Sequence, residues 1–310
     1  MSAGSPTFPR GVTLTTAATY GHGSTSDLGP TEGNRFDEFF ARDMALLANL
    51  GITDVRLTFD WPRLQPTPGR LDDFWAEHVD EVLDAATANH LRVWATLHDG
   101  AAPRWFDDEG GSGDDAALTR WWPHWVEHVA ERFGDRVHGW IPFAGIARDM
   151  PMRPWTDTWG ILRGPSWPVV ASLARADLDR IEPFQGRCDA FGVALHAPDE
   201  SIDELGSEPT DGELDRLAER LATDIHRCAE AADGFDVLVS QFTAHHDDGD
   251  AIAAMTRSLV RAADQAIADG IDLLAVFADP AIRLPSTTTG LLDRDRAVLP
   301  AGAAYFTSNT

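Results

Sequence analysis

The stretch GITDVRLTFD, residues 51–60, shows the pattern that decides the fold. A glycine that ends a helical segment is followed by a short run rich in β-branched and aromatic residues, and an aspartate closes the run. Gly270 precedes a second run of the same kind, as glycines that terminate helices do. Such runs, alternating with longer segments of helical period, are typical of βα units that build a parallel sheet.

Outward from this stretch, the same pattern predicts seven strands and six helices. The strands are expected at residues 11–16, 54–59, 92–97, 137–143, 190–195, 237–241 and 273–277, and the helices at 35–50, 74–89, 121–133, 168–181, 212–232 and 250–269. The interval between residues 143 and 190 holds a segment rich in Pro, Trp and Gly but no further strand signal. We therefore predict an α/β fold, a TIM-type (β/α)8 barrel with one unit shortened or missing around residues 148–187. Residues 1–310 contain no linker or repeat and are expected to form a single domain.

The composition of the chain excludes several classes of partner and of chemistry. The chain carries 50 acidic and 25 basic residues, a formal net charge of −25, so nucleic acid is a poor partner for it. All the basic residues are arginine, which excludes Schiff-base chemistry on a lysine. No stretch is long and apolar enough to span a membrane, and the first residues lack the features of a signal peptide, so we expect a cytoplasmic protein with no membrane partner.

In a parallel barrel the chemistry lies at the carboxyl ends of the strands. This rule selects a candidate pocket formed by Asp60, His98, Asp99, Asp149, His196, Gln241 and Asp279, to which the family resemblance given below adds Arg56. Imidazole and carboxylate groups that face one mouth are suited to a divalent metal, with His98, His196 and His245 or His246 as candidate ligands. The alternative is that these are separate hydrogen-bonded side chains. No cofactor is expected otherwise.

Three stretches resemble glycoside hydrolase family 1, the retaining β-glucosidase family. They are GITDVRLTFDWPRLQPTPGRLD at 51–72, LRVWATLHDGAAPRWF at 91–106 and ERFGDRVHGWIPFAGI at 131–146. The last is similar to a family motif that reads F-G-D-R-V-x-x-W-I-T-F-N-E-P. The resemblance implies a (β/α)8 barrel and glycosidase activity on carbohydrates.

The same alignment places other residues where the family has its catalytic glutamates. The acid/base position holds Gly145, and the nucleophile position holds Gln241. A retaining mechanism needs two carboxyl groups about 5 to 5.5 Å apart. Arg56 is retained at the position that supports the nucleophile in the family, although an arginine paired inside the barrel would read the same.

Three functions follow as alternatives. The first is an inactive family relative that binds a carbohydrate or another small molecule, or is a partner of an active enzyme. The second is an enzyme with altered, metal-assisted chemistry at the mouth. The third is a β-glycosidase that uses substitute carboxylates, with Asp149 and Asp247 as the nearest candidates in sequence.

The tryptophans suggest an interface as well. All 11 fall between residues 61 and 167. Trp121, Trp122 and Trp125 have helical spacing and are expected to pack a helix on the barrel. Trp155, Trp159 and Trp167 lie in the shortened region, where an incomplete wall would leave apolar surface to be covered, so a homodimer is a hypothesis.

Overall fold

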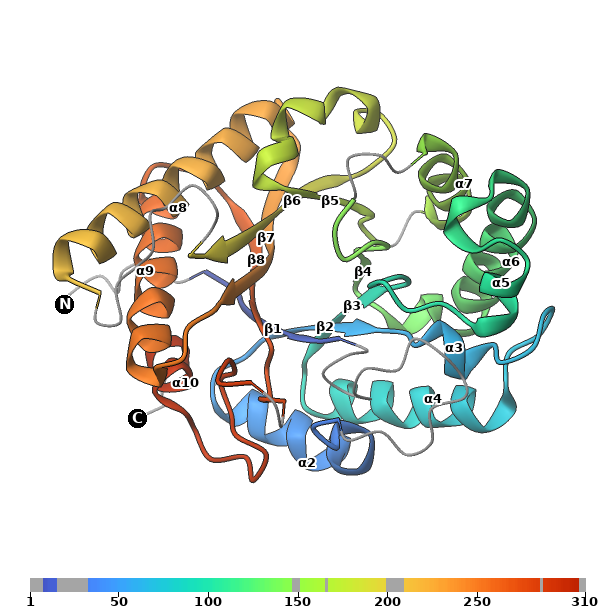
Figure 1. Cartoon of the computed structure of the whole chain (residues 1–310), viewed down its shortest axis with the longest axis horizontal. Helices are drawn as coiled ribbons and strands as arrows, with labels where there is room; N and C mark the ends of the chain where they lie inside the picture. Colours follow the sequence, from blue (N-terminus) through green and yellow to red (C-terminus); the bar gives the residue numbers. More distant parts are fainter. Residues whose placement is uncertain are drawn as a thin grey trace.

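Eight parallel strands form a nearly closed barrel, with helices around it (Figure 1). The computed structural model describes residues 8–15, 33–146, 151–164, 167–198, 209–284 and 287–306. The strands are ordered β4-β3-β2-β1-β8-β7-β6-β5. They are β1 Arg10–Leu14, β2 Asp54–Thr58, β3 Arg92–Thr96, β4 Gly139–Trp140, β5 Val170–Ala174, β6 Ala190–Ala197, β7 Asp236–Ala244 and β8 Leu273–Asp279. The predicted TIM-type barrel is confirmed.

The predicted long helices lie close to their expected bounds, apart from the one at residues 168–181. The α-helices are α2 Phe36–Asn49, α3 Trp61–Leu64, α4 Asp73–Ala88, α5 Arg104–Asp108, α6 Asp115–Phe133, α7 Met152–Leu162, α8 Asp211–Ala232, α9 Gly249–Ala268 and α10 Pro300–Tyr305. Side-chain caps define several starts. Asp114 accepts hydrogen bonds from the backbone N–H groups of Ala116 and Ala117 at the start of α6, at 2.7 and 3.0 Å.

The region around residues 148–187 differs from the prediction in one respect. The predicted helix at 168–181 is wrong. Its first part forms β5, the one strand of the eight that the sequence pattern did not predict. Short 3-10 helices, η3 Arg175–Arg180 and η4 Glu182–Phe184, follow this strand in place of an α-helix. The shortened unit therefore keeps its strand and lacks its outer α-helix within the described residues.

The barrel closes between β4 and β5 by isolated contacts. Two parallel bridges join these strands, Trp140 with Val169 and Ile146 with Leu173. The Trp140 N–H donates to the Pro168 carbonyl at 2.8 Å, and the Ile146 N–H donates to the Ser172 carbonyl at 2.9 Å. We call this junction the β4–β5 seam. Most other neighbouring strands share longer ladders, so the seam is the most sparsely bonded part of the wall.

The interior of the barrel is layered. Trp94 and Phe277 belong to an apolar cluster that fills one layer. A Cβ atom on Gly139 would lie 2.7 Å from the Trp94 ring, and one on Gly11 would lie 2.5 Å from the Phe277 ring, so the large rings require glycines opposite them. A second buried set is polar and includes Thr13, Arg56, Thr96, Ser172 and Ser240.

Segments far apart in sequence are joined by a buried ion pair. The Arg296 guanidinium donates from Nε and NH2 to the two carboxylate oxygens of Asp43, at 2.9 and 2.7 Å. Both side chains are almost completely buried. The C-terminal segment is thereby fixed to α2. None of the helices in the described part of the chain is long and apolar enough to cross a membrane.

The tryptophans of the shortened region cover their own barrel. Trp155 is completely buried, its ring lies against Phe143 and Phe184, and its Nε1 donates to the Arg187 carbonyl at 3.0 Å. Trp159 and Trp167 are half-buried against the same core. Because β5 completes the wall, the expected gap is not the reason for these residues, and the homodimer stays a prediction.

Candidate functional site

Arg56 is the central cation of the barrel mouth. It lies in β2 and is 1% exposed, with Nε donating to the Thr96 hydroxyl at 2.9 Å and NH1 donating to the Ser240 carbonyl at 2.7 Å. Burial lowers the pKa of its guanidinium to about 10, and the carboxylates of Asp279 and Asp99 act in the opposite direction. The arginine remains charged at neutral pH and is fixed in position from β3 and β7.

Asp279 is the last residue of β8, and one of its two carboxylate oxygens accepts hydrogen bonds. Its Oδ2 accepts from the Gln241 Nε2 at 3.0 Å and from the Thr243 hydroxyl at 3.2 Å. Its Oδ1 is buried and has no hydrogen-bond partner among the described residues. Burial raises the pKa of Asp279 to about 6, opposed by Arg56 and by the two hydrogen bonds. This carboxyl therefore titrates close to neutral pH.

Gln241 is held as an amide by these contacts. Its Nε2 donates to the Thr243 hydroxyl at 3.2 Å as well as to Asp279. A carboxylate at the same place would have no hydrogen to donate to Asp279. The local hydrogen-bond pattern is therefore specific for glutamine.

Asp60 and Asp99 add two carboxyl groups at the ends of β2 and β3. Asp60 is 4% exposed, accepts from the Arg63 backbone N–H and forms a 2.5 Å ion pair with the Arg63 NH1. Burial raises the pKa of Asp60 to about 6, although Arg63 opposes the shift. The charge of Asp99 raises the pKa of Asp60 and of Asp279, so the predicted residues Arg56, Asp60, Asp99 and Asp279 share one electrostatic site.

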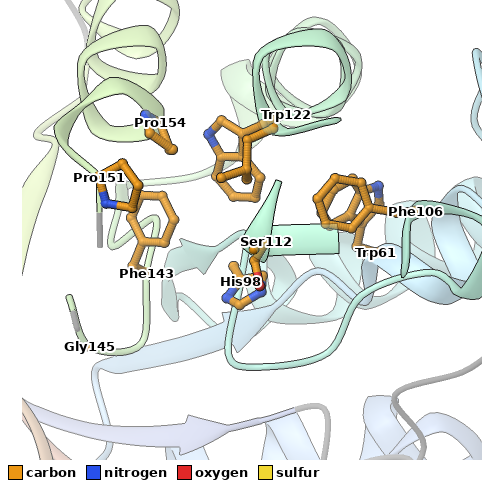
Figure 2. Close-up of a pocket in the computed structure, with 11 residues that line it drawn as sticks. Trp61, His98, Phe106, Ser112, Trp122, Phe143, Gly145, Pro151 and Pro154 are labelled. Atoms are coloured by element: carbon orange, nitrogen blue, oxygen red, sulfur yellow. The ribbon is translucent and has the colours of Figure 1, made fainter. Parts of the chain in front are cut away.

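An aromatic cavity of about 370 Å³ lies beside the polar mouth (Figure 2). It is lined by Trp61, His98, Phe106, Ser112, Gly113, Leu118, Trp122, Phe143, Gly145, Pro151 and Pro154. Gly145 is exposed at its edge, and a Cβ atom built there meets nothing within 4 Å. The position aligned with the family acid/base therefore faces open space.

His98 is the ionisable group of this cavity. Its ring packs edge-on to Trp122 and tilted to Phe143, and its Nδ1 accepts from the Gly100 backbone N–H at 3.3 Å. Burial lowers the pKa of His98, opposed by Asp99 and Asp107. The imidazole is neutral at pH 7, and because Nδ1 is an acceptor, Nε2 carries the proton.

The other predicted residues lie elsewhere or outside the described ranges. His196 stacks with His245, their ring centroids 6.4 Å apart, near the ends of β6 and β7. Asp247 is exposed, and Asp149 lies outside the described residues. Among the residues that the structure describes, no group of three or more His, Cys, Asp and Glu side chains could hold a metal ion.

Sequence reasoning identified His98 and Gly145 but not the cavity that contains them. The lining comes from several separate elements, so no single motif indicates it. Trp122 was expected to pack α6 against the barrel, and it is indeed buried, but one of its surfaces also faces the cavity. The available signal was the aromatic residues Trp61, Phe106 and Phe143 that follow strand ends.

The amino-acid sequence is similar to those of known glycosidases over part of its length. Residues 18–150 match the model of glycosyl hydrolase family 1. Aryl-phospho-beta-D-glucosidase BglC of Bacillus subtilis (strain 168) is 28% identical over 103 residues, which cover 33% of this chain and 22% of that protein. The lactase-like protein of Mus musculus is 26% identical over 140 residues, 44% of this chain and 25% of that protein. Residues 18–150, somewhat less than half of the chain, are therefore similar to glycosyl hydrolase family 1.

The whole barrel, not only the matched part, has the family 1 fold. A family 1 β-glucosidase from Thermotoga maritima superimposes with a TM-score of 0.72 at 13% identity and covers 96% of both chains. The apo structure of β-glucosidase 1317 gives a TM-score of 0.72 at 18% identity, with the same coverage. The aligned segments span about a quarter of the length of the curated family 1 relatives.

Proposed function

We propose that this family 1 barrel does not hydrolyse glycosides by the retaining mechanism and instead binds a carbohydrate or another small molecule at its mouth. Gln241 carries the argument, because its amide donates to Asp279 and Thr243 and cannot serve as a carboxylate nucleophile. Gly145 offers no acid/base group at the facing position of the alignment. Both carboxyl groups of the mechanism are then missing.

The polar mouth supports binding. Asp279 Oδ1 is an acceptor with no partner among the described residues, Asp99 is half-buried, and both carboxylates interact electrostatically with Arg56. Sugar hydroxyl groups are donors for such acceptors, and several of the relatives are named β-glucosidases. A β-glucoside or a related sugar is therefore the ligand to test first.

The test is a panel of fluorogenic β-glycosides with the purified chain. We expect turnover no faster than in buffer, together with saturable binding of a non-hydrolysed sugar by calorimetry. The variant Asp279→Asn should weaken that binding, whereas the exposed Asp247→Asn should leave it unchanged. Turnover that persists after repeated purification would contradict the proposal.

A second candidate function, hydrolysis by substitute carboxylates, is favoured by one observation. The pKa values of Asp60 and Asp279 are both about 6, near the range in which a carboxyl can donate and accept a proton at neutral pH. Turnover abolished in Asp60→Asn or Asp279→Asn would establish it. The single variants Asp149→Asn and Asp247→Asn test the two loop carboxylates in the same way, by turnover of the same panel of β-glycosides.

The metal-assisted alternative and the homodimer are tested separately. A chelator should leave the melting temperature unchanged if no structural divalent ion is bound. Multi-angle light scattering at micromolar concentration should give twice the 33.8 kDa chain mass if the homodimer forms. These two measurements do not depend on glycoside chemistry.

A further inference from the structure

The aromatic cavity lies beside the polar mouth, and its described lining residues differ from those of the carboxyl and arginine cluster. Its lining comes from α3, the ends of β3 and β4, the loop that holds α5 and η1 Gly111–Gly113, α6 and α7. None of the described lining residues belongs to strands β5 to β8, where Gln241 and Asp279 lie. The cavity is therefore separate from the carboxyl and arginine cluster.

The rings that line the cavity are fixed by hydrogen bonds and by packing on one another. Trp122 Nε1 donates to the Thr158 hydroxyl at 2.7 Å, and Trp61 Nε1 donates to the Gln65 Oε1 at 2.8 Å. The polar edges of both indoles are thus satisfied within the protein. The Trp61 and Trp122 rings pack edge-on at 5.6 Å, and Trp122 stacks on Phe143 at 5.0 Å with an angle of 23°. Rings held in this way need little reorganisation to receive another ring.

Few polar groups reach the cavity. The lining contains no Asp, Glu, Arg or Cys among the described residues, and its ionisable side chain is His98. The neutral imidazole presents an N–H at Nε2, and Ser112 adds a hydroxyl. Figure 2 shows His98 between the Trp61 and Phe106 pair and the Phe143 ring. A sugar ring requires several hydrogen-bond partners, which the described lining of this cavity does not offer.

The size of the cavity fits a small ligand. Its volume of about 370 Å³ is near the lower end of the range of roughly 300 to 1,000 Å³ found for small-molecule sites. Gly145 is exposed at the edge of the cavity, and a Cβ atom built there meets nothing within 4 Å.

We propose that this cavity is a binding site for an uncharged aromatic compound of one or two rings that carries a hydrogen-bond acceptor. The compound packs against the parts of Trp61, Trp122 and Phe143 that line the cavity, with His98 as donor. The site does not depend on whether the mouth binds a sugar. A ligand of this class enters past Gly145 and leaves the carboxyl cluster free.

The test uses acetophenone as the probe, with ethylbenzene as the same ring without an acceptor and benzylammonium as a charged analogue. Saturation-transfer NMR and calorimetry on the whole chain measure binding. We expect saturable binding of acetophenone, weaker binding of ethylbenzene and none of benzylammonium. Glucose should not compete with acetophenone. Absence of saturable acetophenone binding, or equal binding of benzylammonium, would overturn the proposal.

Variants locate the probe. Gly145→Phe should abolish binding of both uncharged probes, because the new ring enters the cavity. The control is Gly160→Phe on α7, an exposed glycine whose added Cβ also meets nothing within 4 Å. His98→Phe should weaken acetophenone about tenfold and leave ethylbenzene unchanged, and His98→Gln should restore part of the loss. Equal effects of the two glycine variants, or equal loss of both probes in His98→Phe, would contradict this site. Circular dichroism checks that each variant is folded.

Discussion

At the scale of single residues, Asp279 carries a charge that its surroundings disfavour. Its Oδ1 has no partner among the described residues, and burial outweighs the attraction of Arg56. A buried carboxyl of this kind lowers stability in its ionised form. Its position at the mouth, where it accepts from the Gln241 amide, supports the ligand-binding role proposed for this site.

Replacing Asp279 by Asn should therefore stabilise the protein at neutral pH. The pKa rises from 3.8 to about 6 on folding, so the folded state binds the proton more tightly. The free energy of unfolding then falls as the pH rises through this interval, by about 3 kcal/mol, and stays lower above it. Asp279→Asn removes that loss. Urea unfolding at pH 4 and pH 7 should show the gain only at pH 7.

The exposed Asp247→Asn is the control for this experiment and should show no gain at either pH. If Asp279→Asn were instead destabilising at pH 7, the electrostatic attraction between Asp279 and Arg56 would outweigh the burial of the carboxyl.

Gln241→Glu should have the opposite effect. It replaces an amide donor by a second carboxylate within hydrogen-bond distance of Asp279, and two such groups cannot both ionise at little cost. We expect a loss on the order of 3 kcal/mol at pH 7, largely recovered at pH 5, where the pair shares a proton. Gln185→Glu, on the exposed surface, is the matched change. A fully stable Gln241→Glu variant would show that the mouth still accepts a carboxylate at this position.

At the scale of elements, α6 connects the fold to the cavity, since it carries Leu118 and Trp122. Asp114→Ala removes the cap that accepts from two backbone N–H groups. The expected loss is about 1 kcal/mol in chemical unfolding. Asp115→Ala, in the first turn but without the capping bonds, should cost only a few tenths of that amount. Equal losses in the two variants would mean that charge, not the cap, stabilises this start.

The elements also show what the sequence could and could not predict. Buried strands bounded by turn signals, such as β2 and β3, were predicted nearly to the residue, because short runs with β-branched and aromatic residues between helical segments are typical of strands. β5 was missed, since its run VASLA is followed by RADLDR and the whole segment has helical period and good helix formers. Pairing with β6 and the β4–β5 seam decide its conformation.

The candidate site was likewise predicted only in part. The strand-end rule identified Asp60, Asp99 and Asp279 before any geometry was known, because strand ends meet at one mouth, whereas Arg56 was indicated by the family resemblance. The partner of each carboxyl could not be predicted. The pairing of Asp279 with Gln241 depends on the side chains that the register of β7 and β8 brings together.

At the scale of the whole molecule, the pair Asp43 and Arg296 joins segments 253 residues apart in sequence. Arg296→Met leaves a buried carboxylate without its partner and should lower the free energy of unfolding by about 3 to 5 kcal/mol. The double variant with Asp43→Leu should recover much of this loss. Denaturant unfolding measures both, with the exposed Arg294→Met as control. A small effect of Arg296→Met alone would mean that water reaches Asp43.

The β4–β5 seam has a consequence for amide hydrogen exchange. Isolated bridges protect the Trp140 and Ile146 amides, whereas long ladders protect strands such as β6 and β7. Local opening should therefore start at the seam, and its amide protons should exchange with deuterium earlier than those of the opposite wall. Ile146 directly follows Gly145 at the edge of the aromatic cavity. Slower exchange there on addition of an aromatic compound would report occupancy of the cavity through the barrel wall itself.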